Sequence, residues 1–182
     1  GNIYLSVKYR ARSMVPALSL IIGLLVAEAL DEASGQKINA QLKWPNDLLL
    51  KNKKICGILI ESEIEQGNIE LTIGIGVNYF IAKKESWWGD LGELADLLPR
   101  EKLINTILKK IISYKEHGYT DWQQAWKKKC MHQNEEINIL NNAQKKIQGV
   151  FRGIDNEGKM LLETSNGTQT ISSGECSITG LY

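Results

Sequence analysis

The chain has 182 residues, 43% hydrophobic and 24% charged, which is the composition of an ordinary soluble globular protein. Its formal net charge of +1 provides no strong field, so we expect neither nucleic acid nor an anionic membrane as a partner. The three cysteines, Cys56, Cys130 and Cys176, are odd in number and lack C-x-x-C spacing. That pattern argues against a disulfide framework and a zinc site, and it indicates a reducing, cytoplasmic compartment.

The first predicted elements are a strand and a buried helix. Apolar and polar residues alternate over Ile3–Tyr9, which predicts a strand. The apolar run that follows predicts a helix over Ala17–Ala33, opened by Pro16 and closed by Gly35. A membrane span needs about 20 apolar residues, and this run contains Glu28. We therefore interpret it as a core helix rather than a membrane span or a signal peptide.

Four strands are predicted next, separated by short turns. They cover residues 40–43, 48–50, 54–64 and 69–78. The predicted turns are Pro45-Asn46-Asp47, Lys51-Asn52-Lys53 and Gln66-Gly67-Asn68. Because the connections are so short, we expect antiparallel pairing.

Two amphipathic helices are predicted after these strands. One runs from Pro99 to Gly118, and the other begins near Thr120 or Asp121 and ends on the basic run 127–129. The second helix carries Trp122 and Trp126 on one face. The first is expected to bury a single apolar stripe made of Leu103, Ile104, Ile107, Leu108, Ile111 and Ile112.

The sequence pattern changes after His132. Short strands alternate with turns at 141–142, 155–158 and 165–167, which predicts five strands forming a small barrel. We place a domain boundary near 130–134, giving a core of residues 1–132 and a tail domain of residues 133–182. The predicted fold class is α+β, with a mixed, mostly antiparallel sheet, helices and a small C-terminal β-barrel.

A lysine and three glycines suggest a site on the predicted sheet. Lys54 begins an apolar strand, although a lone lysine there is more often a solvated edge charge. Gly57 removes a side chain within that strand, and glycine weakens a strand unless a ligand or backbone must come close. Gly74 and Gly76 clear one face of the next strand, for which tight packing against an aromatic ring is an equal explanation. Together these residues are consistent with an anion site over a bare backbone floor.

Three motifs in fixed order are far more specific than any one of these residues. They are Lys43-Trp44-Pro45-Asn46-Asp47-Leu48, Lys54-Ile55-Cys56-Gly57-Ile58-Leu59 and Gly74-Ile75-Gly76-Val77-Asn78. This combination resembles the biotin protein ligase family. The opening residues 1–6 and the tail segment Arg152-Gly153-Ile154-Asp155, with Gly158 and Gly174-Glu175, are also similar to that family. The resemblance implies a catalytic core like that of class II aminoacyl-tRNA synthetases and biotin ligases, with an SH3-like tail domain.

The resemblance also implies a reaction. Biotin and ATP, with Mg²⁺, would form biotinyl-5′-adenylate, and a lysine of a biotin carboxyl carrier protein domain, such as that of acetyl-CoA carboxylase, would then take the biotinyl group. The catalytic residue implied is Lys54, which would place positive charge where the carboxylate meets the α-phosphate. By analogy, a homodimer is also implied.

The binding residues implied by the resemblance surround this lysine. Gly57, Leu59, Gly74 and Gly76 would line the biotin and adenylate groove. Asp47 would help to hold Mg²⁺, and Trp88 would stack on adenine. Arg152 would either reach the nucleotide phosphates or be a surface charge of the barrel. The remaining residues of the biotin and adenylate site would be Lys43, Asn46 and Asn78.

The family's Gly-Arg-Gly-Arg loop over biotin, and the residues that hold the ureido ring, would stand upstream of Gly1. We therefore expect the chain to be either a fragment or a natural truncation, with weak or no biotin binding of its own. The helix-turn-helix of some bacterial members would also lie upstream, and nothing in this sequence suggests a repressor. Two alternatives remain: a lipoate-protein ligase, and an inactive remnant that binds a carrier domain. Trp44-Pro45 and the tail motif favour biotin.

Overall fold

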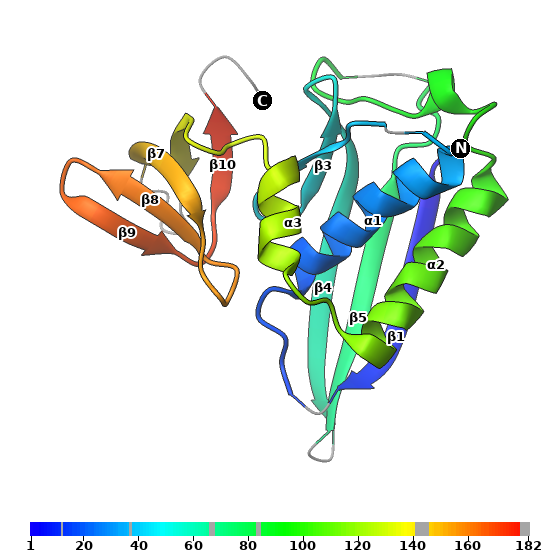
Figure 1. The fold of residues 1–182 in the computed structure, drawn as a ribbon, viewed down its shortest axis with the longest axis horizontal. Helices are drawn as coiled ribbons and strands as arrows, with labels where there is room; N and C mark the ends of the chain where they lie inside the picture. Colours follow the sequence, from blue (N-terminus) through cyan, green and yellow to red (C-terminus); the bar gives the residue numbers. More distant parts are fainter. Residues whose placement is uncertain (12, 37, 66–67, 83–84, 141–145, 179–182) are drawn as a thin grey trace.

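The structure is a computed structural model that describes residues 1–11, 13–36, 38–65, 68–82, 85–140 and 146–178. Its strands form two five-stranded sheets, one in the core and one in the tail. Figure 1 shows them side by side, with helix α3 lying between them. The predicted α+β class is confirmed. The predicted turns at 66–67 and 141–142 lie outside the described residues.

The core sheet contains β1 (Ile3–Ala11), β2 (Gln41–Lys43), β3 (Asp47–Leu50), β4 (Lys53–Glu65) and β5 (Asn68–Val77). Their order is β1-β5-β4-β3-β2, and each neighbouring pair is antiparallel. The short turns account for the β2–β3–β4–β5 meander, as predicted. The pairing of β1 with β5 is a long-range contact that the local pattern could not predict.

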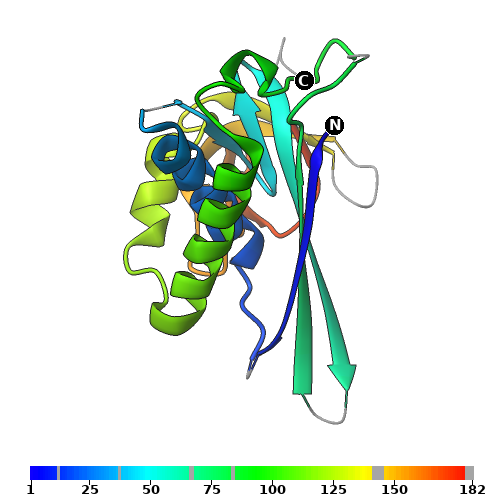
Figure 2. The same cartoon turned by 90° about the vertical axis from the view of Figure 1, so that its right-hand side faces the viewer.

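The helices cover one face of this sheet, as Figure 2 shows with the sheet seen nearly edge-on. The buried helix is α1 (Leu18–Ser34), which ends at Gly35 in the left-handed conformation, as predicted. Outside it lie α2 (Arg100–His117) and α3 (Trp122–Lys129), and a short 3₁₀ helix, η1 (Gly92–Leu94), precedes α2. Within the described residues, no helix is long and apolar enough to cross a membrane.

The predicted apolar stripe of α2 is wrong at one position. Leu103, Ile107 and Ile111 are buried, but Ile112 is 55% exposed. Each helical residue turns the side chain by about 100°, which puts Ile112 past the edge of the face that packs on the core. The single buried face of this helix is therefore narrower than its apolar residues suggest.

The tail sheet contains the five predicted strands in the order β10-β6-β7-β8-β9, all paired antiparallel. They are β6 (Glu136–Leu140), β7 (Lys146–Ile154), β8 (Met160–Thr164), β9 (Gly167–Ile171) and β10 (Glu175–Ile178). Buried Phe151, Met160 and Leu162 fill its inner face. The domain boundary near 130–134 stays a prediction, and it falls between α3 and β6.

Candidate active site

A shallow depression of about 390 Å³ lies on the face of the core sheet that the helices leave open. Tyr4, Gly76 and Gly57 follow one another across β1, β5 and β4 in register, and Ser6, Gly74 and Leu59 form the next row. Three of these six positions are glycines, so the floor between the two rows is largely backbone. The bordering side chains are prominent, since Tyr4 is 78% and Leu59 is 59% exposed.

Lys54 and Asp47 form an ion pair in this depression. The Lys54 Nζ lies 2.6 Å from Asp47 Oδ1, and both residues line the depression. The side chain of Asp47 is only 11% exposed, so solvent screens this pair less than it screens a surface ion pair. The carboxylate therefore holds the ammonium group over the glycine floor.

A β-bulge directs Lys54 toward this face. Lys54 and Gly57 are three residues apart, and in a regular strand they would point to opposite faces. The register between β3 and β4 shifts, however: Leu48 pairs with Cys56, whereas Leu49 pairs with Lys54. The extra residue is Ile55, which is fully buried. The bulge thus brings the lysine to the same face as the glycine.

Gly57 makes room for the lysine side chain. A Cβ on Gly57 would lie 3.3 Å from Lys54 Cε and 3.4 Å from its Nζ. Gly74 is less tightly enclosed, because a Cβ there would meet the backbone O of Leu59 at 3.5 Å and its Cβ at 3.6 Å. The aromatic-packing explanation suits Gly76 only loosely, since a Cβ there would lie 3.9 Å from the ring of Tyr4.

The two predicted asparagines hold backbone segments. Asn46 lines the depression, but its side-chain amide donates to the Ile58 carbonyl at 2.8 Å. Asn78 lies outside the lining, and its amide donates to the carbonyls of Lys54 and Gly89, each at 3.1 Å. Asn78 therefore fastens the loop around Gly89 to the strand that carries the lysine.

Three other predicted residues do not line the depression, although the backbone of one of them, Trp88, pairs with that of Lys54. Lys43 is 7% exposed, and it lies close enough to His132 for its charge to help lower the pKa of that residue. Trp88 borders a different cavity of about 320 Å³, with Lys53 and Leu94 among its neighbours. Arg152 lies on β7, where its Nε donates to Glu163 Oε2 at 2.5 Å.

The sequence reasoning did not single out Tyr4 and Ser6, which also line the depression. Their signal was the alternation within the first strand, which puts both on the same face. Without the β1–β5 register, however, nothing in the sequence linked that face to Gly74 and Gly76.

The described residues contain no cluster of three or more His, Cys, Asp or Glu side chains suited to a metal ion. Mg²⁺ is commonly held in nucleotide sites by one or two carboxylates together with substrate phosphates. Asp47 fits that role as a single carboxylate beside the depression, and the ion's other ligands would come from phosphate and water.

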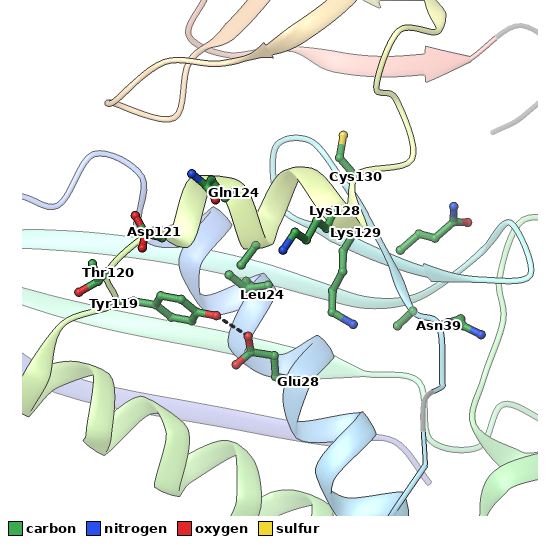
Figure 3. Close-up of a pocket in the computed structure, with 13 residues that line it drawn as sticks. Leu24, Glu28, Asn39, Tyr119, Thr120, Asp121, Gln124, Lys128, Lys129 and Cys130 are labelled. Carbon is green, nitrogen blue, oxygen red and sulfur yellow. Dashed lines mark hydrogen bonds between the residues drawn. The ribbon is translucent and has the colours of Figure 1, made fainter.

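A larger pocket of about 840 Å³ lies between α1, α3 and the start of β2. Tyr119 Oη in its lining donates to Glu28 Oε1 at 2.6 Å, drawn dashed in Figure 3. Lys129, also in the lining, pairs with Asp31 outside it, with 3.0 Å between Lys129 Nζ and Asp31 Oδ2. Burial, followed by the bond to Glu28, raises the pKa of Tyr119 to about 12. None of the predicted site residues lines this pocket, so we place the site in the smaller depression.

Comparisons with known proteins divide the chain into two matches. Residues 2–78 match the Biotin/lipoate A/B protein ligase family, and residues 132–178 match the Biotin protein ligase C terminal domain. The first family includes lipoate ligases, so it does not distinguish the two substrates. The second match is specific to biotin protein ligases, and it favours them over the lipoate alternative.

Individual relatives agree with both matches. The Bifunctional ligase/repressor BirA of Salmonella typhimurium is 30% identical over 98% of this chain and 59% of its own length. The Biotin--[acetyl-CoA-carboxylase] ligase of Paracoccus denitrificans is 28% identical over 87% of this chain and 71% of its own. A solved structure, the biotin protein ligase from Aquifex aeolicus in complex with biotin and ATP, superposes with a TM-score of 0.72. It is 26% identical, with 97% of this chain and 78% of that one covered.

The chain thus spans 59% of the length of the Salmonella relative. Within that span, the ordered motifs, the antiparallel core sheet with its glycine floor, and the separate tail match all agree. The chain belongs to the biotin protein ligase family.

Proposed function

We propose that the protein attaches biotin to a lysine of a carrier domain, using ATP. A carboxylate oxygen of biotin attacks the α-phosphorus of ATP, the bond to pyrophosphate breaks, and biotinyl-5′-adenylate forms. The lysine amine of the carrier then attacks the acyl carbon and releases AMP. The observation that carries this proposal is the Lys54–Asp47 ion pair, 2.6 Å apart, above a backbone floor made of glycines.

Lys54 is the proposed catalytic residue because negative charge builds up at the α-phosphate as the carboxylate attacks. An ammonium group held in place before the reaction stabilises that charge without reorganising. Asp47 supplies the restraint, and Gly57 leaves the space that the ammonium occupies. With Gly74 and Gly76 also lacking side chains, a flat ligand can lie directly on the sheet, with Leu59 at its side.

We assign the other binding residues by family resemblance. Asp47 would hold Mg²⁺ together with the phosphates, and the ion would neutralise phosphate charge. Asn46 borders the depression, and Asn78 acts through the backbone of Lys54. Nucleotide contacts by Lys43, Trp88 and Arg152 require ligand atoms that extend beyond the depression, because none of the three lines it.

The acceptor and the compartment are also proposed. The acceptor is a biotin carboxyl carrier protein domain, a proposal supported by the printed name of the Paracoccus relative. The compartment is the cytoplasm, because the three cysteines are free thiols and reducing compartments maintain them.

The test compares Lys54→Ala with the unchanged full-length protein. We measure biotin-dependent exchange of pyrophosphate into ATP, and transfer of biotin to a carrier domain detected with streptavidin. Loss of one such charge contact typically costs about a hundred- to thousandfold in rate, and we expect a loss of that size. Lys51→Ala is the matched control, since Lys51 is exposed and pairs with Glu93 outside the depression.

Two results would overturn the proposal. Wild-type exchange rates in Lys54→Ala would remove the role given to that lysine. Exchange that depends on lipoate but not on biotin would favour the alternative ligase.

A further inference from the structure

The segment 42–47 connects the tail to the candidate active site. At its start, the Leu42 carbonyl accepts a hydrogen bond of 3.1 Å from the Met131 amide, in the link between the two sheets. At its end, Asp47 pairs with Lys54 in the depression. Only a few residues therefore separate contacts to the tail from the proposed catalytic pair.

Trp44 makes the most specific of these contacts. Its indole Nε1 donates to the Gly158 carbonyl of the tail at 3.0 Å, and the residue is only 2% exposed. A buried N–H without a partner is costly, so this bond restricts where the indole can lie relative to the tail. The carbonyl belongs to the turn between β7 and β8.

That turn is itself rigidly held. The Asp155 carboxylate accepts hydrogen bonds from the amides of Glu157 and Lys159, each at 2.9 Å. Gly158 has a φ of +78°, and a Cβ there would lie 2.9 Å from Leu20 Cδ1 and 3.0 Å from Ala17 Cβ. The turn therefore fits directly against the first residues of α1, and glycine is the residue that allows this approach.

The other end of the segment is fixed to the strand that carries the lysine. The Pro45 carbonyl accepts from Ser19 Oγ at 3.3 Å. The Asn46 carbonyl accepts from the Ile58 amide at 2.9 Å. Because both ends are fixed, a shift of Trp44 has to be taken up within the short stretch that ends at Asp47.

We infer that Trp44 is a positioning residue that couples the tail turn at Gly158 to the Lys54–Asp47 pair. The tail thereby sets the geometry of the proposed reaction without touching the reacting atoms. This inference rests on the proposed function for its kinetic consequence, but its structural consequence is independent of it.

The experiment uses the full-length protein with Trp44→Phe, which keeps a buried ring and removes the donor. Amide hydrogen exchange is followed at Ile58, and acylation of Lys54 by acetic anhydride is followed by mass spectrometry. Losing the net contribution of one hydrogen bond should accelerate both by about three- to tenfold. The turnover number (kcat) of adenylate formation should fall by a similar factor, with the KM for biotin unchanged.

Two further variants make the result decisive. Gly158→Ala displaces the acceptor while leaving Trp44 intact, and it should produce the same changes if Trp44→Phe does not fold. Trp122→Phe is the same substitution on α3, and it should leave Ile58 exchange and Lys54 acylation as in the wild type.

The inference is overturned if Trp44→Phe and Gly158→Ala both leave the Ile58 amide exchange rate and the Lys54 acylation rate unchanged. It is also overturned if exchange accelerates equally at Ile73 in the centre of the sheet, because that indicates a general loss of stability. Absence of adenylate formation by the wild type contradicts the proposed function instead, and the exchange and acylation measurements still decide the role of Trp44.

Discussion

Replacing Gly57 by alanine is expected to slow adenylate formation without weakening the fold. The new Cβ would lie 3.3 Å from Lys54 Cε, 3.4 Å from its Nζ and 3.6 Å from Asp47 Oδ1. The two closest atoms are at the end of a flexible side chain, so the lysine moves aside and the backbone stays. The ammonium therefore shifts by a few tenths of an ångström from its position over the floor.

The substitution is expected to have opposite effects on rate and on stability. A misplacement of about 1 Å costs roughly a hundredfold in rate, so we expect a loss of about tenfold in the kcat of adenylate formation. Gly57 does not have a positive φ, and glycine-to-alanine changes at such positions stabilise proteins by about 0.4–1 kcal/mol. The variant should therefore be as stable as the wild type, or more stable, while reacting more slowly.

The assay combines pyrophosphate exchange with urea unfolding of the same preparations. Gly74→Ala is the matched control, because its Cβ would contact only Leu59, at 3.5–3.6 Å, and not the lysine. It should raise the KM for the ligand that lies on the floor more than it lowers kcat. Wild-type kcat in Gly57→Ala would refute the reasoning, as would unfolding at a lower urea concentration.

Two further predictions concern the tail sheet and His132, which packs against it. Burial, and then the charge of Lys43, lower the pKa of His132 from 6.5 to about 4. The neutral imidazole therefore makes its full contribution to the stability of the fold above pH 6.5. That contribution is lost as the pH falls toward 4, which lowers the free energy of unfolding by up to about 3 kcal/mol. Urea unfolding at several pH values should show a shallower acid loss in His132→Gln, and parallel curves would contradict this. Gly149→Ala would place a Cβ against the Glu163 carbonyl and 2.9 Å from Leu162 Cγ. We expect several kcal/mol of destabilisation. An unchanged urea midpoint would contradict this, because it would show that the tail strands can move apart to accommodate the added methyl group.

Much of the fold could be predicted because its signals are local. The alternation in β1, the apolar run of α1 with Gly35 after it, and the closely spaced turns each specify an element through nearby residues. The prediction for Ile112 failed because its exposure depends on where α2 meets the core, which is a tertiary property.

The candidate site was only partly accessible from the sequence. Lys54, Gly57 and Gly74 could be named because charge and missing side chains are visible in the motif, and the structure brings them together. The Lys54–Asp47 contact, by contrast, depends on a bulge that no local pattern marks. Nor does the motif show that Trp44 hydrogen-bonds to a residue 114 positions later in the chain.

The bulge at Ile55 makes strand register between Leu50 and Gly57 matter as much as residue identity. Without the bulge, the three-residue spacing would put Lys54 and Gly57 on opposite faces, and the ammonium would point toward the buried layer beneath the sheet. Every residue of the motif would still be present, but the charge would be on the wrong side. A homologue that keeps the lysine and the glycine three residues apart but pairs these two strands without a bulge is therefore expected to keep the fold and lose the reaction. A sequence alignment that scores only matching letters would overlook that difference.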